Sequence, residues 1–502
     1  MSPQARTFLA LAALVAGLLG AAQAQAAPVI VVDGDRAVRT NDPLVPDPAS
    51  VRLAPPPGRA TARIAGNARM TKKGSRFVKR ALGKALRRER ITRATYNAYW
   101  RTYRKARRVR KKLRGARGTQ LGYVIVSLDR IAARGKLGVT RMPSLFAQLD
   151  RNRRYWPRLS YPGSGDQITF KGSELLYQYY PGRGLQLQPL STFKKANQMH
   201  AACFGTLDAP CRRAGLRRLL DEMIAFSVKR GRGFIAWEYS FDFGGGSPPW
   251  MSGMAQATGI QALGRAAQLL GEPRYDDVAR RALGAFQAAP PTGVQTRGFR
   301  GGTHYLQYSF APRLYIFNAF LQSLIGLYDY ARATGDTRAM SLYNRAEPEA
   351  EHEIPYSDVG DWSRYNYRGH EANHDYHELM REFLQSMCSR RLGKIYCDYA
   401  AKYRGYQVDP PELIYTGPGT ARRKRYMRVR FDVSKLSAVE IQIYRNGKLA
   451  LKRLATFRRG RGSFLFRPMR TGLFEVRLAA KELRTGLGKK DKATGEFEVV
   501  QP

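Results

Sequence analysis

Between residues 118 and 409, apolar side chains recur at helical spacing in long segments that are joined by short turns containing glycine. The clearest pairs join Met254–Leu270 to Tyr275–Phe286 and Leu314–Ala333 to Arg338–Ala346. Repeated helical hairpins of one construction are typical of an α-solenoid or a closed α/α toroid. We favour the toroid, whose inner helix ends would form a groove suited to a polymer; that last step is analogy with other toroids.

Beyond Pro410 the pattern changes to the alternation of polar and apolar residues that is typical of strands. The expected strands are Tyr426–Val433, Val439–Tyr444, Leu449–Ala455, Ser463–Phe466, Leu473–Leu478 and Glu496–Val499. Asn446-Gly447 is a hairpin turn signal between two of them. Short strands at this density predict a separate immunoglobulin-like sandwich over 410–502, so the fold class is mainly α with an added β domain.

The N-terminal segments differ in composition from both regions. Residues 1–26 have an apolar core and small-x-small cleavage sites, which predict a secretory signal peptide; an uncleaved anchor is the alternative. Residues 27–58 are rich in proline and are expected to be a linker. Residues 59–117 hold 23 Lys and Arg against a single acid, Glu89, with spaced aromatic residues, which favours basic amphipathic helices. The folded part is therefore expected to be secreted or associated with the cell envelope.

The charge is uneven along the chain. The sequence of 502 residues has a net charge of +47. Residues 59–117 contribute 22 of these charges and residues 410–502 contribute 14, whereas the helical region is only moderately basic. A surplus of this size predicts a polyanionic partner, which is nucleic acid, an acidic polysaccharide or an anionic envelope. Export makes nucleic acid the least expected of the three.

Four cysteines fall into two close pairs, Cys203 with Cys211 and Cys388 with Cys397. Two local disulfides are the simplest arrangement, although four cysteines allow three connectivities. Because the chain has no Cys-x-x-Cys pair, we expect no zinc site built from them.

Three polar and aromatic stretches stand out in the helical region. The first, around Tyr180, reads equally well as a glycine-rich turn. The second, from Trp250 to Gln256, offers Ser252 as the N-cap of a helix. The third, 356–378, places three histidines at helical spacing and contains the zincin pattern His370-Glu371-Ala372-Asn373-His374, but the preceding Tyr-Arg-Gly is unlike a zinc helix. We expect no metal site and no cofactor.

Taken in order, these stretches resemble the D-glucuronyl C5-epimerase family, which converts glucuronate to iduronate in heparan-type polysaccharides. The matching runs are Trp250-x-Ser252-x-Met254-Ala255-Gln256, then Tyr308, then Asn318-Ala319-Phe320-x-x-Ser323-Leu324-Ile325-Gly326-Leu327-Tyr328-Asp329, then Tyr365-x-x-Arg368, then Asp375-Tyr376-His377. Together they cover about 170 to 390, and the basic segment and the C-terminal region have no evident counterpart. The resemblance implies an α/α toroid that acts on an acidic polysaccharide.

The resemblance also implies site residues. Tyr308, Tyr365, Arg368 and Tyr376 are the expected catalytic residues. Substrate contacts are expected from Tyr180, Trp250, Gln256, Gln307 and His377. One departure stands out: the family has Glu where this chain has Gln307, and glutamine cannot transfer a proton.

Epimerisation at C5 removes a proton beside a carboxylate and returns it to the opposite face, so it needs two acid/base groups. Tyrosine, with an unperturbed pKa near 10, needs a nearby cation to act as a base, and Arg368 could supply it while pairing with the substrate carboxylate. We assign proton transfer to Tyr376 and Tyr308, and the carboxylate to Arg368 and Tyr365. A polysaccharide lyase, which begins with the same proton abstraction, and a non-catalytic glycan-binding protein are the alternatives.

Overall fold

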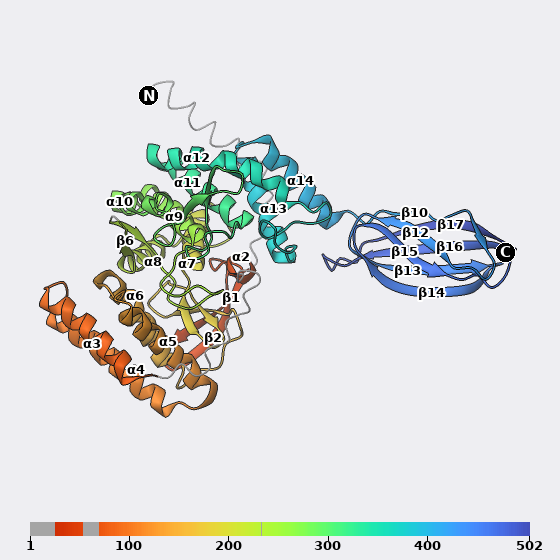
Figure 1. Ribbon diagram of the computed structural model, residues 1–502. Coiled ribbons are helices and arrows are strands. Elements are labelled where there is room, and N and C mark those ends of the chain that lie inside the picture. The colour runs from red at the N-terminus through yellow and green to blue at the C-terminus, as the bar shows by residue number, and fades with distance from the viewer. Residues whose placement is uncertain (1–25, 54–69, 232, 502) are drawn as a thin grey trace, which may run out of the picture. The chain divides into compact units, whose positions relative to one another are not determined.

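The computed structural model describes residues 26–53, 70–231 and 233–501. The chain forms two compact units, 1–349 and 350–502, and each is described by itself. Figure 1 shows helices in the middle of the chain and strands at the C-terminus. The fold is therefore a helix-rich region followed by a β region, as the hydrophobic pattern predicts. The predicted signal peptide at 1–26 lies almost wholly outside the described residues.

The predicted linker is wrong for residues 27–53, which form regular structure. Strands β1 (Ala27–Asp33) and β2 (Arg36–Asp42) pair antiparallel, and β1 also pairs in parallel with β3 (Gln167–Phe170). The five-stranded sheet continues through β4 (Tyr177–Tyr180) and β5 (Gly184–Leu187). Prolines do not prevent this, because Pro48 occupies the first turn of helix α2 (Pro48–Val51), where no backbone donor is needed. The pairing of β1 with β3, far along the chain, has no local signal.

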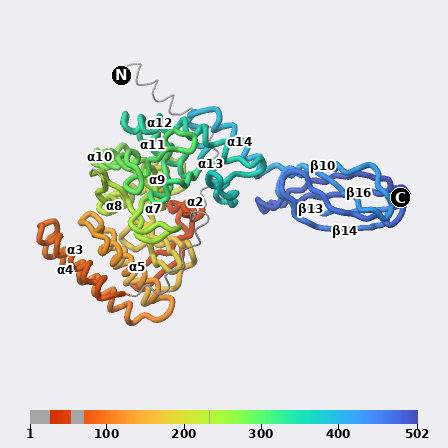
Figure 2. Tube along the Cα trace, in the orientation of Figure 1, coloured from red at the N-terminus to blue at the C-terminus, as the bar shows by residue number. Residues whose placement is uncertain are grey.

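The basic segment contains two helices, α3 (Lys72–Arg87) and α4 (Arg93–Lys112), which are capped by Thr71 and Thr92. They are followed by α5 (Gly115–Ala133) and α6 (Met142–Tyr155), and Figure 2 shows the path of this part of the chain. Val78 and Leu82 of α3 are fully buried, and the Tyr103 hydroxyl of α4 donates to the Asp129 carboxylate of α5 at 2.6 Å. The apolar stripe of this basic segment therefore packs inward and most of its basic residues remain in water, although Arg107 pairs with the buried Asp129.

The rest of this unit is built from helical hairpins. Its helices are α7 (Pro189–Ala202), α8 (Arg213–Ala225), α9 (Gly253–Leu270), α10 (Pro273–Ala282) and α11 (Phe317–Thr334), and α12 (Thr337–Glu353) crosses the unit boundary. Two short hairpins, β6 (Val228–Arg230) with β7 (Phe234–Ala236) and β8 (Gln295–Arg297) with β9 (Thr303–Tyr305), lie between helices. Three 3-10 turns, Val139–Arg141, Leu283–Phe286 and Ile354–Ser357, complete the helical region.

Close packing between the hairpins depends on glycine. A Cβ on Gly326 of α11 would lie 2.6 Å from the Ala257 carbonyl oxygen of α9, so only glycine lets these two helices approach this closely.

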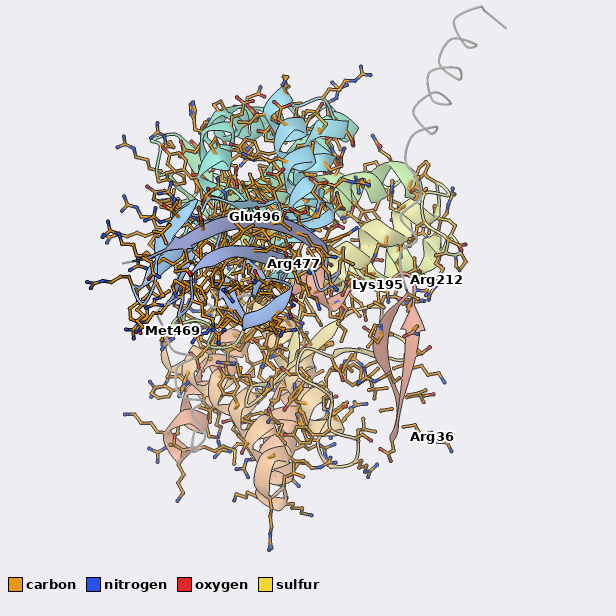
Figure 3. All side chains as sticks on the ribbon, turned by 90° about the vertical axis from the view of Figure 1, so that its right-hand side faces the viewer. Arg36, Lys195, Arg212, Met469, Arg477 and Glu496 are labelled. Carbon is orange, nitrogen blue, oxygen red and sulfur yellow. A yellow bond between two sulfur atoms is a disulfide. The ribbon has the colours of Figure 1, made fainter. Side chains whose placement is uncertain are left out.

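Lys195 of α7 is buried and pairs with the Glu174 carboxylate at 2.7 Å. Arg212 also contacts this carboxylate, at 2.9 Å. Figure 3 labels Lys195 and Arg212. The buried lysine is therefore neutralised by a carboxylate rather than left unpaired.

The second unit joins two helices to two packed sheets. Its helices are α13 (His374–Ser389) and α14 (Lys394–Val408). One sheet has the order β10-β12-β15 and the other β11-β17-β16-β13-β14. The strands are β10 (Leu413–Tyr415), β11 (Thr420–Arg422), β12 (Met427–Val433), β13 (Ser437–Arg445), β14 (Lys448–Phe457), β15 (Gly460–Phe466), β16 (Gly472–Glu482) and β17 (Lys490–Val500). Inward residues of both sheets, such as Phe431 and Ile441, share one core.

Local signals position several of these elements. Ser252 caps α9 by accepting from the Ala255 amide, as its position predicts. Asn446 and Gly447 both have positive φ in the turn between β13 and β14, which is the geometry of a type I′ hairpin. Disulfides join Cys203 to Cys211 and Cys388 to Cys397. Among the described helices, none combines the length and apolar character needed to cross a bilayer.

Candidate active site

The residues predicted for the site fall in both units. Tyr180, Trp250, Gln256, Gln307 and Tyr308 belong to the first unit, and Tyr365, Arg368, Tyr376 and His377 belong to the second.

Trp250 is the centre of an aromatic cluster in the first unit. Its ring stacks on the Tyr239 ring with centroids 4.2 Å apart. It also makes T-shaped contacts with the rings of Tyr308 and Phe310, at centroid distances of 5.7 and 5.3 Å. Its indole nitrogen donates to the Phe241 carbonyl at 2.7 Å. Trp250 and Tyr308 are both 1% exposed. Trp250 therefore supports the Tyr308 ring from within the core.

The segment that carries Tyr308 is bonded directly to the start of α9. The Gly253 amide donates to the Leu306 carbonyl at 3.1 Å and the Ser309 amide donates to the Met251 carbonyl at 3.0 Å. The Ser252 hydroxyl accepts from the Ala255 amide and donates to Gln307 Oε1 at 3.1 Å. Gln307 thus holds the segment that carries Tyr308 against the N-terminus of α9. This contact needs only the amide oxygen of glutamine as an acceptor and involves no proton transfer.

Gln256 has a position that the sequence does not indicate. It is fully buried; its Oε1 accepts from the Trp237 amide at 3.0 Å and its Nε2 donates to the Trp237 carbonyl at 2.9 Å. Both ends of its amide therefore hold the main chain beside the aromatic cluster. No part of this side chain is exposed to a ligand, so its predicted substrate contact is not supported in this conformation.

Tyr180 lies at the end of β4 and is half-buried. Its hydroxyl donates to Gln178 Oε1 at 2.7 Å, and its ring contacts Phe241 with centroids 4.5 Å apart. Gln188 connects it to the cluster, because Gln188 Nε2 donates to the Tyr180 hydroxyl at 3.3 Å and Gln188 Oε1 accepts from Tyr239 at 2.8 Å. Burial raises the pKa of Tyr239 well above its ordinary value, so this hydroxyl stays protonated.

In the second unit, Tyr365 and Arg368 lie on a tight hairpin-like loop. The Ala372 amide donates to the Ser363 carbonyl at 2.8 Å and the Tyr365 amide donates to the His370 carbonyl at 3.2 Å. At the tip, the Gly369 amide donates to the Asn366 carbonyl at 3.0 Å. Tyr365 also contacts Tyr376, the third residue of α13, with ring centroids 4.6 Å apart. The structure thus brings these two predicted catalytic tyrosines together.

Arg368 is held in a strained conformation. Its φ is +55° at the third position of the turn, where a type II turn favours glycine. Its side chain is exposed and its guanidinium carbon lies 5.1 Å from the centre of the Tyr367 ring. The ring it covers is therefore that of Tyr367. The exposed residues Arg391 and Lys424 have a similar positive φ, so this conformation does not by itself mark Arg368 as functional.

His377 is part of the core of this unit. It is fully buried and stacks on Trp362 with centroids 3.6 Å apart. Nδ1 pairs with the Ser363 hydroxyl at 2.8 Å and Nε2 with the Tyr403 carbonyl at 3.2 Å. Burial lowers the pKa of His377 to about 4, so the ring is neutral near pH 7, with Nε2–H as donor and Nδ1 as acceptor. A substrate contact from His377 is therefore not supported.

The histidine pattern also has a different structure from the one expected. Helix α13 begins at His374 and Asn373 is its N-cap, so His370 lies in the preceding loop and shares no helical face with His374 and His377. Among the described residues, no group of three His, Cys, Asp or Glu side chains is placed to hold a metal ion.

Arg484 and Asp361 form an ion pair that the sequence does not indicate. Arg484, which follows β16, donates to the Asp361 carboxylate at 3.1 Å and to the Glu371 carboxylate at 2.8 Å, and it lies 5.5 Å over the Trp362 ring. Asp361 is 3% exposed and also accepts from the Leu436 amide at 3.1 Å. These bonds attach the loop of Tyr365 and Arg368 to the β region of the same unit.

Comparison with known proteins finds a family match in the middle of the chain. Residues 230–405 match the family described as D-glucuronyl C5-epimerase C-terminus. The D-glucuronyl C5-epimerase of Caenorhabditis elegans is 28% identical over 178 residues, 32% of this chain and 29% of that protein. The uncharacterized protein MJ1128 of Methanocaldococcus jannaschii is 28% identical over 177 residues, 34% of this chain and 58% of that protein. The chain thus spans less than two thirds of either relative.

Comparison with solved structures gives low scores. The CARDB domain of PF1109 from Pyrococcus furiosus has a TM-score of 0.14 at 16% identity and covers 18% of this chain and 98% of that domain. The endo-β-1,4-mannanase of Thermotoga petrophila has a TM-score of 0.15 at 10% identity and covers 73% of this chain and 83% of that enzyme. Scores this low support no conclusion about the fold.

Proposed function

We propose that the protein is an exported uronate C5-epimerase that converts D-glucuronate-type to L-iduronate-type residues in an acidic polysaccharide. The observation that carries the proposal is the contact between Tyr365 and Tyr376, which come from a loop and a helix within the matched family region. Two phenol groups in contact with each other, one of them on the same loop as an exposed guanidinium, are the kinds of group that proton transfer next to a carboxylate requires. The closed toroid and the immunoglobulin-like sandwich remain part of this proposal.

In the proposed mechanism, Arg368 pairs with the uronate carboxylate and stabilises the negative charge that develops when the C5 proton leaves. Tyr365 donates a hydrogen bond to the same carboxylate. Tyr376, whose ring contacts that of Tyr365, removes the C5 proton, and a second acid/base group returns a proton to the opposite face. Tyr308 is 1% exposed within the aromatic cluster of the first unit, so this mechanism does not assign the proton transfer to it. Gln307 in place of glutamate removes one titratable group, so the acid/base chemistry proceeds without it.

The test is incorporation of deuterium at C5 when the full chain and a glucuronate-containing polysaccharide are incubated in heavy water. We expect exchange together with a mixture of glucuronate and iduronate, and loss of exchange in Tyr376→Phe. A matched control is Tyr367→Phe, whose ring lies on the same loop but has no assigned proton transfer. Appearance of an unsaturated uronate would show a lyase instead, and binding without any exchange would show a non-catalytic glycan-binding protein.

A further inference from the structure

Two cavities adjoin on the surface of the first unit. One has a volume of about 680 Å³ and lies between the β6–β7 hairpin, the end of α10 and the start of α12. The other has a volume of about 660 Å³ and lies against the β8–β9 hairpin. Gln287 lines both, so they are neighbours at this residue. Their sizes are those of ligand pockets in proteins.

Arginine is the charged residue of both cavities. Arg281 and Arg338 line the first and Arg297 and Arg345 line the second, and all four are exposed. Within the described part of the chain, no acidic side chain lines either cavity. Elsewhere in this unit exposed arginines commonly pair with a carboxylate, as Arg274 does with Glu272 at 2.7 Å. Four unneutralised guanidinium groups in one depression attract an anion with several charges.

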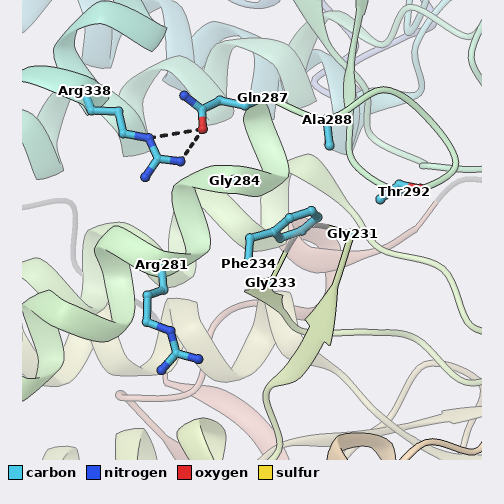
Figure 4. A pocket seen from close by; sticks show the side chains of 9 residues that line it. All are labelled: Gly231, Gly233, Phe234, Arg281, Gly284, Gln287, Ala288, Thr292 and Arg338. Carbon is cyan, nitrogen blue, oxygen red and sulfur yellow. Dashed lines mark hydrogen bonds between the residues drawn. The ribbon is translucent and has the colours of Figure 1, made fainter.

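The first cavity also has an aromatic wall. Figure 4 shows the Phe234 ring between Arg281 and the Arg338–Gln287 pair, in which Arg338 Nε donates to Gln287 Oε1 at 3.1 Å. A Cβ on Gly231 would lie 2.9 Å from the Phe234 ring and one on Gly284 would lie 2.4 Å from its Cβ, so the glycines let neighbouring backbone pack against Phe234. An apolar ring flanked by cations fits a sugar acid, which has an apolar face and a carboxylate, better than it fits a phosphate.

A buried carboxylate holds the loop that borders the second cavity. Glu349 is buried, and its two oxygens accept from the Arg300 amide at 2.8 Å and from the Gly302 amide at 2.7 Å. Because both oxygens are occupied by the main chain, this carboxylate fixes the loop between β8 and β9 instead of pairing with the lining arginines. A groove whose loop is already ordered loses little entropy when a ligand binds.

We propose that these two cavities form one groove that binds the uronate carboxylates of an acidic polysaccharide chain. The inference deepens the proposed function, since it takes the same polymer as ligand and adds binding residues that include none of the proposed catalytic groups. Each arginine would pair with a carboxylate, and Phe234 would pack against one sugar ring. The groove would hold a stretch of polymer on the enzyme between reactions.

The test is calorimetric titration of the full chain with an unsulfated, glucuronate-containing oligosaccharide. We expect Arg281→Gln/Arg338→Gln and Arg297→Gln/Arg345→Gln each to raise the dissociation constant about tenfold. The matched control, Arg213→Gln/Arg332→Gln, removes the same charge from exposed positions outside both cavities and should change it about twofold or less. Equal effects in all three pairs would overturn the groove and leave only general attraction between charges.

Phe234→Leu separates a sugar from other anions. It should weaken binding of the oligosaccharide several-fold and leave binding of inorganic polyphosphate unchanged, because only the sugar uses the ring. If duplex DNA or polyphosphate loses affinity for the Phe234→Leu variant as the oligosaccharide does, the assignment to a polysaccharide is wrong.

The two proposals can fail separately. Tight binding of the oligosaccharide by the wild-type protein without C5 exchange contradicts the epimerase. C5 exchange together with an unaltered dissociation constant in both double arginine variants contradicts the groove.

Discussion

At the scale of single residues, Arg368 gives the clearest conflict between stability and function. A left-handed conformation costs a non-glycine residue about 1 kcal/mol or more, and the turn position of Arg368 favours glycine. We expect Arg368→Gly to raise the free energy of unfolding by about 1 kcal/mol and to abolish C5 exchange. Arg368→Ala is the control: it keeps the strain and loses the guanidinium, so stability should not rise. Urea unfolding and exchange measured on the same samples check this, and a less stable Arg368→Gly protein would contradict it.

His377 makes a pH-dependent contribution to stability. Its folded pKa is about 4, whereas an unfolded histidine has a pKa near 6.5, so only the unfolded chain binds the proton between these values. The contribution is present above pH 6.5 and is lost as the pH falls toward 4. His377→Phe keeps a ring beside Trp362 but cannot bind this proton. Between pH 4 and pH 6.5 the free energy of unfolding of the variant should therefore change less with pH than that of the wild type, by the slope that one bound proton contributes. Unfolding of both proteins at a series of pH values measures the difference, and parallel curves would rule it out.

At the scale of elements, the loop of Tyr365 and Arg368 depends on a bond from the β region. Removing Arg484 would leave the Asp361 carboxylate buried without a cation, which typically costs about 3 to 5 kcal/mol. We therefore expect Arg484→Met to destabilise the second unit strongly and Arg484→Met/Asp361→Asn to recover most of the loss. Arg477→Met, which breaks an exposed pair with Glu475, should change the free energy of unfolding far less, because water already screens that pair. Denaturant unfolding compares the three, and an equal cost for Arg484→Met and Arg477→Met would contradict the buried pair.

The elements also show what the sequence could predict. Helices α9 to α11 and strands β12 to β16 begin and end within about four residues of the predicted bounds, because each has an apolar face whose period is visible locally. Strand β17 begins at Lys490, well before its predicted start at Glu496. Strand β1 is not predicted: its partner β2 is adjacent, but the prolines that follow favour a linker, and its other partner, β3, lies more than a hundred residues away. The burial of Gln256 and His377 is not predicted for a related reason: a polar residue becomes a core residue only when distant backbone satisfies it, and these partners are not visible in the pattern.

At the scale of the whole molecule, the net charge of +47 belongs mostly to segments outside the matched family region. In α3 the basic side chains are on the exposed face, while Val78 and Leu82 pack inward. Charge and folding are therefore carried by different residues of the same helix, and one can be changed without the other.

Replacing the exposed Lys72, Lys73, Arg76, Lys79 and Arg80 with glutamine should therefore leave stability within about 1 kcal/mol of the wild type, since none of these residues is buried. Attraction to a long polyanion should fall, and its dependence on salt should become shallower, because fewer counterions are released on binding. Elution of both proteins from an immobilised acidic polysaccharide over a salt gradient checks this. As a control, Val78→Ala in the same helix should lower stability by about 1 kcal/mol or more and leave elution unchanged. Unchanged elution of the glutamine variant would show that the charge of α3 does not contact the polymer, and would confine binding to the arginine-lined groove and the β region.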